Sequence, residues 1–237
     1  MEKPFKFKKF TIHQDRCAMK IGTDGVLLGA WTSLSNEPSS ILDIGAGTGV
    51  LSLMLAQRSQ AQNIEALEID VDAYEQCSEN FENSPWADRL FCYHASLIEF
   101  VEEVEGLFDL IICNPPFYSE DYKTNDNSRD LARFQDAMPF EHLIYAVANL
   151  LSEEGIFSVI IPFKEEDNFV DLASKVGLSL KRSLRVKGNP NSEIKRSLLE
   201  FSFYDSNIES SEIVIETERH QYTDDYINLT KDFYLKM

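Results

Sequence analysis

From residue 41 onward, short apolar runs alternate with segments whose apolar residues follow a helical spacing. The runs of strand length are "ILDI" at 41–44, "IEALEI" at 64–69, "LFCYH" at 90–94, "FDLIIC" at 108–113 and "GIFSVIIP" at 155–162. Helical spacing occupies the intervals 50–58, 70–83, 142–151 and 165–177. Strands that alternate with helices are typical of a parallel sheet covered on both faces. The pattern therefore predicts an α/β fold with three layers, α/β/α.

The pattern changes after residue 177. Two strand-like runs, at 178–187 and 195–204, flank the turn-rich sequence "GNPN" at 188–191, which indicates an antiparallel hairpin. We therefore expect a mostly parallel sheet with an antiparallel edge hairpin. Near the C-terminus, "DDYINLTKDFYLKM" predicts an amphipathic helix that packs by Tyr226, Leu229 and Phe233.

The chain has 237 residues, of which 43% are hydrophobic and 26% charged, so one domain is expected. Within it we distinguish a basic N-terminal segment and helix (1–35), a core (36–205) and a C-terminal tail and helix (206–237). The apolar runs are too short to cross a bilayer. No apolar run follows the lysines of "MEKPFKFKKF", so no secretion signal is predicted.

Cysteine and histidine are few and scattered. Cys17, Cys77, Cys92 and Cys113 include no C-x-x-C pair, so they are interpreted as reduced thiols rather than a zinc site or disulfides. The histidines match no metal-ligand spacing; they are His13, His94, His142 and His220. We therefore expect a cytoplasmic protein without a metal.

The formal net charge of −18 argues against a nucleic-acid partner. The charge is unevenly distributed, however. Residues 1–20 hold six Lys or Arg against two acids, and residues 181–196 hold six against Glu193 alone. Chance clustering of lysines on a surface would give the same composition, so these two basic segments acquire a meaning only with other evidence.

A glycine cluster follows the first predicted strand. "DIGAGTG" places Asp43 at the strand end, with Gly45, Gly47 and Gly49 spaced two apart. Glycines allow a tight turn and a close approach of a ligand to the backbone, and the next helix presents free N–H groups. A dinucleotide site would need G-x-G-x-x-G, and the third glycine comes one residue too early for that. Glu68, 19 positions after Gly49, can hold ribose hydroxyls, although strand-end glutamates are often only solvated.

Together, "DIGAGTG" and Glu68 resemble the S-adenosylmethionine site of class I methyltransferases. The resemblance covers about residues 20–205 and implies a Rossmann-like, seven-stranded sheet whose last strand is antiparallel. It implies cofactor contacts from Asp43, Gly45, Ala46, Gly47, Gly49, Glu68, Ile69, Ser96, Leu97 and Asn114. Many relatives carry an Asp after the third strand for the adenine amino group of the cofactor, whereas this chain has Ser96. A hydroxyl would make that contact more weakly.

The fourth strand ends in "NPPF", Asn114-Pro115-Pro116-Phe117. This resembles the motif of methyltransferases that modify a planar, conjugated nitrogen, above all the N6 amine of adenine. The Asn114 side-chain oxygen and the Pro115 carbonyl are the two expected hydrogen-bond acceptors for the amine. Prolines restrict φ and hold those carbonyls in place, and Phe117 offers a face on which a base can stack. The alternative is that Pro-Pro only ends a strand.

The NPPF motif is shared by enzymes that act on adenine N6 in DNA or RNA, on a protein glutamine amide (N5), or on guanine N2 in rRNA. "DRCAMKIGTDGVLLGAW" at 15–31 resembles more narrowly the bacterial family that methylates adenine 37 at N6 in a valine tRNA. By this resemblance Thr23 and Asp24 line the methionine end of the cofactor, whereas Leu27, Leu28 and Trp31 only pack on the sheet. A binding protein that has kept the fold without activity would need neither "NPPF" nor "DIGAGTG".

A tRNA substrate gives the basic segments a role, because phosphates around an anticodon loop need cationic contacts. The candidate RNA contacts are Lys6, Lys8, Lys9, Arg16, Lys20, Arg185, Lys187, Lys195 and Arg196. The polar stretch 118–137 follows the NPPF motif and is interpreted as a lid, with Arg129 and Arg133 either on RNA or solvated on a helix. We expect a monomer that binds tRNA and no membrane.

Overall fold

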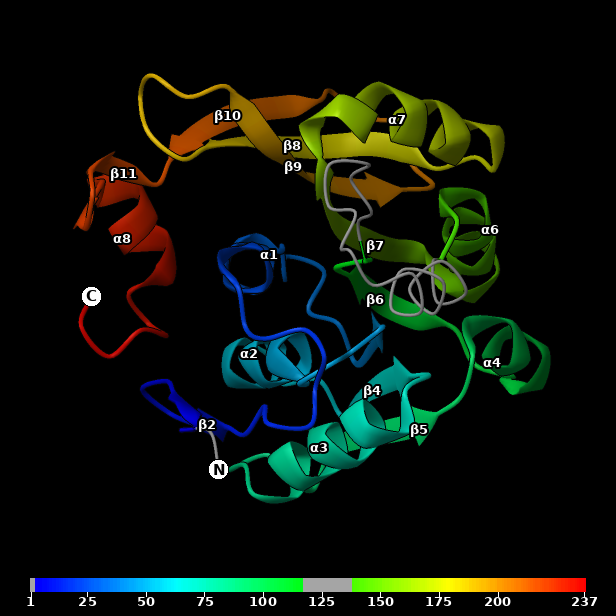
Figure 1. The fold of residues 1–237 in the computed structure, drawn as a ribbon. Coiled ribbons are helices and arrows are strands. Elements are labelled where there is room, and N and C mark those ends of the chain that lie inside the picture. The colour runs from blue at the N-terminus through cyan, green and yellow to red at the C-terminus, as the bar shows by residue number, and fades with distance from the viewer. Residues whose placement is uncertain (1–2, 117–137) are drawn as a thin grey trace, which may run out of the picture.

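The computed structural model describes residues 3–116 and 138–237. Within these residues eight strands form the central sheet (Figure 1). In chain order they are β3 (Ser40–Ile44), β4 (Asn63–Glu68), β5 (Leu90–His94), β6 (Phe108–Cys113), β7 (Leu151–Pro162), β8 (Ser179–Lys187), β9 (Ile194–Ser202) and β10 (Glu209–Val214). Their order across the sheet is β10-β8-β9-β7-β6-β3-β4-β5. Neighbours are parallel except that β9 runs antiparallel to β7 and β8, so the predicted mostly parallel α/β fold is confirmed.

The predicted number of strands is wrong: the resemblance implies seven, and the described sheet has eight. The additional strand, β10, pairs in parallel with β8, with Ile213 opposite Val186. Its sequence "ESSEIV" is exposed except at Ile213 and Val214, so it carries no apolar alternation that would predict a strand. The β8–β9 hairpin consequently lies one strand inside the edge of the sheet.

Helices cover both faces of the sheet (Figure 1). On one face lie α1 (Thr23–Trp31), α2 (Val50–Arg58), α3 (Val71–Glu82) and α8 (Asp224–Thr230). On the other lie α4 (Leu97–Glu103), α6 (Phe140–Leu150) and α7 (Glu166–Lys175), with a 3-10 turn, η1 (Phe163–Glu165), before α7. Each face has its own buried core: Leu28, Met54 and Phe81 belong to the first, and Leu143 and Phe169 to the second. The three predicted layers are thereby confirmed.

Helix α4 has no counterpart in the sequence prediction. Its seven residues are too few to show a clear periodicity, but a capping box starts it. The Ser96 hydroxyl accepts from the Glu99 N–H, and the Glu99 carboxylate accepts from the Ser96 N–H. The S-x-x-E spacing at 96–99 was the sequence signal that could have found this helix.

The two ends of the chain lie against each other and against the α1–α2 layer. Short strands β1 (Phe5–Lys6) and β2 (Thr11–Ile12) form a small sheet, and β11 (Glu216–Glu218) and β12 (Gln221–Tyr222) another. The rings of Phe7 and Tyr234 stack with 6.0 Å between their centroids. As predicted, Tyr226 and Phe233 are buried and Leu229 packs beside them, although α8 ends earlier than the amphipathic pattern does. Among the described residues no helix has the length and apolar character needed to cross a membrane.

Candidate active site

The glycine loop between β3 and α2 lies at the carboxyl edge of the sheet. Gly45, Gly47 and Gly49 have φ values of 74°, 54° and 78°, where residues with a side chain are strained. Among the described residues, a Cβ atom on Gly45 or Gly47 would meet nothing within 4 Å, whereas one on Gly49 would lie 2.6 Å from the ring of Phe81. The first two glycines therefore border space that no described residue fills, and the third allows the loop to pack on α3.

Asp43, near the end of β3, lies beneath this loop, and its side chain is fully buried. Its Oδ2 accepts from the Ser52 N–H at 3.1 Å and from the Ser52 hydroxyl at 2.7 Å, while Oδ1 has no hydrogen-bond partner within the described residues. Burial raises the pKa of Asp43 to about 7; the bonds from Ser52 oppose this rise, and the nearby charge of Glu68 adds to it. A buried carboxylate oxygen without a partner suits a cationic group of a ligand.

Glu68 joins the end of β4 to the glycine loop. Its Oε2 accepts from the Gly47 N–H at 2.7 Å and its Oε1 from the Asp70 N–H at 2.9 Å. The N–H groups of Gly45 and Ala46 in turn donate to the Leu67 carbonyl. The carboxylate is thus oriented by backbone bonds, and Ile69 beside it is 56% exposed, which leaves an apolar surface next to a polar one.

Ser96, which follows β5, forms the N-cap of α4. Its hydroxyl donates to the Glu99 carboxylate at 2.7 Å and accepts from the Glu99 N–H at 3.2 Å, so it caps α4. Leu97, the first residue of that helix, is buried. Contact between Ser96 and a cofactor stays a prediction, and within the described residues this hydroxyl acts on the helix start.

Asn114 follows β6 directly, half-buried, with Pro115 buried and Pro116 exposed. A Cβ atom built on Gly25 would lie 4.0 Å from Asn114 Nδ2, so the amide lies beside the first turn of α1. Three predicted residues, Phe117, Arg129 and Arg133, fall outside the described residues, as does the predicted lid at 118–137. The structure therefore brings Asn114 and the first turn of α1 together.

The first turn of α1 holds both predicted residues of the KIGTDG segment. Thr23 is exposed, and within the described residues no side chain caps the first N–H groups of the helix, because the preceding residue is Gly22. Asp24 forms an ion pair with Arg196, with 2.7 Å between Oδ2 and Nε. Asp24 was predicted to contact the cofactor and Arg196 to contact RNA, but in the structure the two side chains pair with each other.

Two buried amides on α3, which the sequence analysis missed, tie the N-terminal segment to the site. Asn80 accepts from the His13 N–H at 2.9 Å and donates to the carbonyls of His13 and Thr48 at 2.8 and 2.9 Å. Gln76 accepts from the Arg16 N–H. Both amides are 1% exposed, and no local sequence signature distinguishes a buried amide from a solvated one. They fix residues 13–16 next to the glycine loop.

Most of the predicted RNA contacts already have partners within the chain. Lys8 donates to the carbonyls of Lys231 and Met237, and Lys20 to that of Gln14. The ion pairs are Arg16 with Glu75 and Glu79, Arg185 with Glu166 and Lys187 with Glu212. Lys6, Lys9 and Lys195 are exposed. The basic N-terminal residues lie by β2 and the others on the β8–β9 hairpin, on opposite sides of Figure 1.

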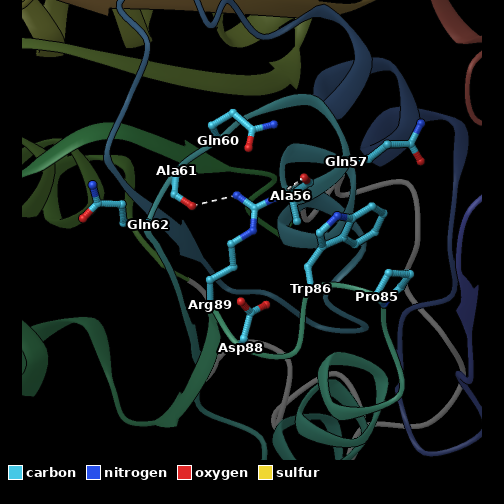
Figure 2. A pocket seen from close by; sticks show the side chains of 9 residues that line it. All are labelled: Ala56, Gln57, Gln60, Ala61, Gln62, Pro85, Trp86, Asp88 and Arg89. Carbon is cyan, nitrogen blue, oxygen red and sulfur yellow. Dashed lines mark hydrogen bonds between the residues drawn. The ribbon is translucent and has the colours of Figure 1, made fainter.

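A surface depression at the opposite end of α2 is a different feature. It is lined by Gln57, Gln60, Gln62, Trp86 and Arg89, among others, and Figure 2 shows the Arg89 guanidinium directed to backbone oxygens. Arg89 donates to the carbonyls of Ala56, Ser59 and Ala61, which closes the C-terminal end of α2. Its charge is used in holding this turn, so the depression offers no second reactive centre. Among the described residues no group of three or more His, Cys, Asp or Glu could hold a metal ion.

Comparison with known proteins is consistent with this geometry. The methyltransferase small domain family matches residues 23–161. A tRNA1(Val) (adenine(37)-N6)-methyltransferase of Flavobacterium psychrophilum is 65% identical over 98% of this chain and 100% of its own, and one of Bacteroides fragilis is 44% identical over the whole of both chains.

Among solved structures, a "predicted O-methyltransferase" from Agrobacterium tumefaciens superimposes with a TM-score of 0.68 at 18% identity, over 89% of this chain and 96% of that one. At this identity the likeness concerns the fold alone, and it supports the class I methyltransferase architecture. The family predicted from the glycine loop, "NPPF" and residues 15–31 is therefore confirmed, whereas the roles of the individual site residues stay predictions. The chain belongs to the methyltransferase small domain family and, within it, to the tRNA1(Val) (adenine(37)-N6)-methyltransferase family.

Proposed function

We propose that this protein transfers a methyl group from S-adenosylmethionine to the N6 amine of adenine in a tRNA, namely adenine 37 in the anticodon loop of a valine tRNA, in the cytoplasm. The observation that carries the proposal is the position of Asn114 and Pro115. They lie at the carboxyl end of β6, beside α1, at the same edge of the sheet as the glycine loop.

The residues at this edge fit the cofactor. Gly45 and Gly47 leave room for it, Glu68 has a carboxylate oriented toward the loop, and Asp43 Oδ1 is a buried oxygen without a partner in the described residues. The first N–H groups of α1 suit a carboxylate. Ile69, Leu97 and Ser96 stay proposals for the adenine end. The bound cofactor would supply a methyl group made electrophilic by its sulfonium.

Asn114 and Pro115 supply what a poor nucleophile lacks. The exocyclic amine of adenine delocalises its lone pair into the ring, and two acceptors that bind its N–H groups favour a tetrahedral nitrogen with an available lone pair. The Asn114 side-chain oxygen and the Pro115 carbonyl are the proposed acceptors. Pro116 fixes the backbone after them, and Phe117 is the proposed stacking surface for the base. Orientation of the amine contributes most of the acceleration.

For tRNA, we propose that exposed lysines contact phosphates. Lys195 at the start of β9 is the best placed of the hairpin residues, because β9 begins at the carboxyl edge, where Arg196 pairs with Pro162 at the end of β7. Lys6 and Lys9 are the proposed contacts on the other side. Five other cations already have a partner within the chain, which each would have to exchange for a phosphate. We therefore propose that they contribute less to tRNA binding; they are Lys8, Arg16, Lys20, Arg185 and Lys187.

A protein glutamine amide is the second candidate, because its NH₂ group could be held by the same two acceptors. The names of the relatives favour tRNA. One experiment compares them: the enzyme is given labelled S-adenosylmethionine with either bulk tRNA from a strain lacking the activity or a release factor. Label recovered as N6-methyladenosine supports the proposal. Label in the release factor, with unmodified tRNA, contradicts it.

A further inference from the structure

The β8–β9 hairpin contacts α1 at both ends of the helix. At the first turn, Arg196 Nε lies 2.7 Å from Asp24 Oδ2. At the far end, Arg182 Nη1 lies 3.2 Å from Glu200, its guanidinium stacks 4.3 Å from the Trp31 ring, and Glu200 accepts from the Ser33 N–H at 2.6 Å. A strand pair distant in sequence therefore contacts the helix at its first turn and at its last residue.

Only the first of these two anchors lies at the active edge. Gly25 follows Asp24 directly, and a Cβ atom there would be 3.4 Å from Val50 Cγ1 and 4.0 Å from Asn114 Nδ2. The backbone of α1 thus forms the wall against which the Asn114 amide lies. A shift of this turn would change the space in which that amide can rotate, and rotation exchanges its oxygen and nitrogen.

We propose that Arg196 and Asp24 act as one positioning unit that keeps the Asn114 oxygen directed at the target amine. This inference rests on the proposed function of Asn114, and it gives Arg196 and Asp24 a shared role in place of separate contacts with RNA and cofactor. The unit acts through α1: the ion pair holds the first turn, the first turn confines the amide, and the amide oxygen accepts from the amine.

The ion pair is suited to a test because its loss need not unfold the protein. The side chains of Arg196 and Asp24 are 33% and 31% exposed, so neutralising one does not leave the other charge buried without water. Asp24 also lies in the first turn of α1, where a negative charge is favourable even without its partner. Arg182, whose guanidinium lies over the Trp31 ring, offers a comparison at the other end of the same helix.

The experiment is a double-mutant cycle of D24N and R196Q, measured as kcat, as KM for tRNA and as Kd for S-adenosylhomocysteine. We expect each single variant to lower kcat about tenfold, with KM and Kd within about twofold, and the double variant to lower kcat by the same about tenfold rather than the product. R196K should recover part of kcat. R182Q should lower the melting temperature without this effect on kcat, which separates positioning from general loosening of α1.

Three results would overturn the inference. R196Q that raises KM for tRNA and weakens its salt dependence, while D24N behaves as wild type, would make Arg196 an RNA contact. D24N that weakens S-adenosylhomocysteine binding, with R196Q unaffected, would make Asp24 a cofactor ligand. Effects on kcat that multiply in the double variant would deny the shared role. Because the cycle is read on whichever acceptor the wild type methylates, a wild type inactive on tRNA refutes the proposed function and not this coupling.

Discussion

The carboxylate of Glu68 accepts a hydrogen bond from the backbone N–H of Gly47, with 2.7 Å between oxygen and nitrogen. Its other oxygen accepts from the Asp70 N–H at 2.9 Å. One side chain thus links the end of β4 to the glycine loop after β3 and to the start of α3. The link presets the loop in the shape that we propose for cofactor binding.

Glu68→Gln should weaken binding of S-adenosylhomocysteine by about tenfold, measured by calorimetry. An amide has one oxygen and cannot accept both backbone bonds, so one N–H loses its partner. Glu65→Gln, on the same strand, is the matched control and should bind normally. An unchanged Kd in Glu68→Gln would show that this carboxylate has no part in the cofactor site.

Asp43 predicts a pH dependence. Burial raises its pKa from 3.8 to about 7, so the folded protein binds a proton that the unfolded chain has lost. The stability from this group is complete below about pH 4 and is lost as pH rises through about 7. Urea unfolding of the ligand-free protein between pH 4 and 8 should therefore show a fall in unfolding free energy that Asp43→Asn lacks. Parallel curves would contradict the assignment.

Asn114→Ala should abolish methyl transfer, by about a thousandfold or more in kcat, while Kd for S-adenosylhomocysteine changes less than about threefold. The alanine removes an acceptor for the amine but leaves the glycine loop, Glu68 and Asp43 in place. Isothermal titration gives Kd and a single-turnover assay gives the rate. Near-normal turnover would refute the role of the Asn114 oxygen.

The features that were readable from sequence are local. Alternating apolar runs locate the strands, three glycines with positive φ need no partner elsewhere in the chain, and "NPPF" follows β6 within one residue. Helix α4 was not predicted, although its S-x-x-E capping box is a local signal of the same kind. These signals depend only on residues that are close in sequence, so they can be recognised without knowledge of the fold.

The remaining features depend on residues far apart in sequence. Arg196 and Asp24 are 172 positions apart, and nothing beside either residue predicts the pair. The same holds for Arg185 with Glu166 and for Lys8 with the Met237 carbonyl. A basic segment therefore predicts where cations occur and not which of them the fold has already engaged. Strand β10 was missed for the related reason that its pairing with β8, rather than its own pattern, makes it a strand.

Arg89→Met should lower the free energy of unfolding by about 2 kcal/mol, because the guanidinium donates to the carbonyls of Ala56, Ser59 and Ala61 (Figure 2). For a chain of this size the melting temperature should fall by about 4–8 °C. Arg219→Met, at an exposed turn, is the control and should change it little. Equal melting temperatures would mean that water replaces Arg89 at these carbonyls.

Lys195→Ala should raise KM for tRNA several-fold, with kcat unchanged, and should reduce the slope of log KM against log salt concentration by about one. Lys195 is exposed at the start of β9; Lys175, which is also exposed but lies at the end of α7, is the control. A salt slope that is the same in both variants would remove Lys195 from the RNA interface.

The central claim is tested most directly by mapping the methyl group on the substrate. Purified valine tRNA without this modification is incubated with the enzyme and S-adenosylmethionine, digested with a base-specific ribonuclease and analysed by mass spectrometry. The account predicts one added methyl group, recovered as N6-methyladenosine, in the fragment that contains adenine 37. A methyl group on another base or at another position would contradict it. So would tRNA that stays unmethylated in the presence of excess wild-type enzyme.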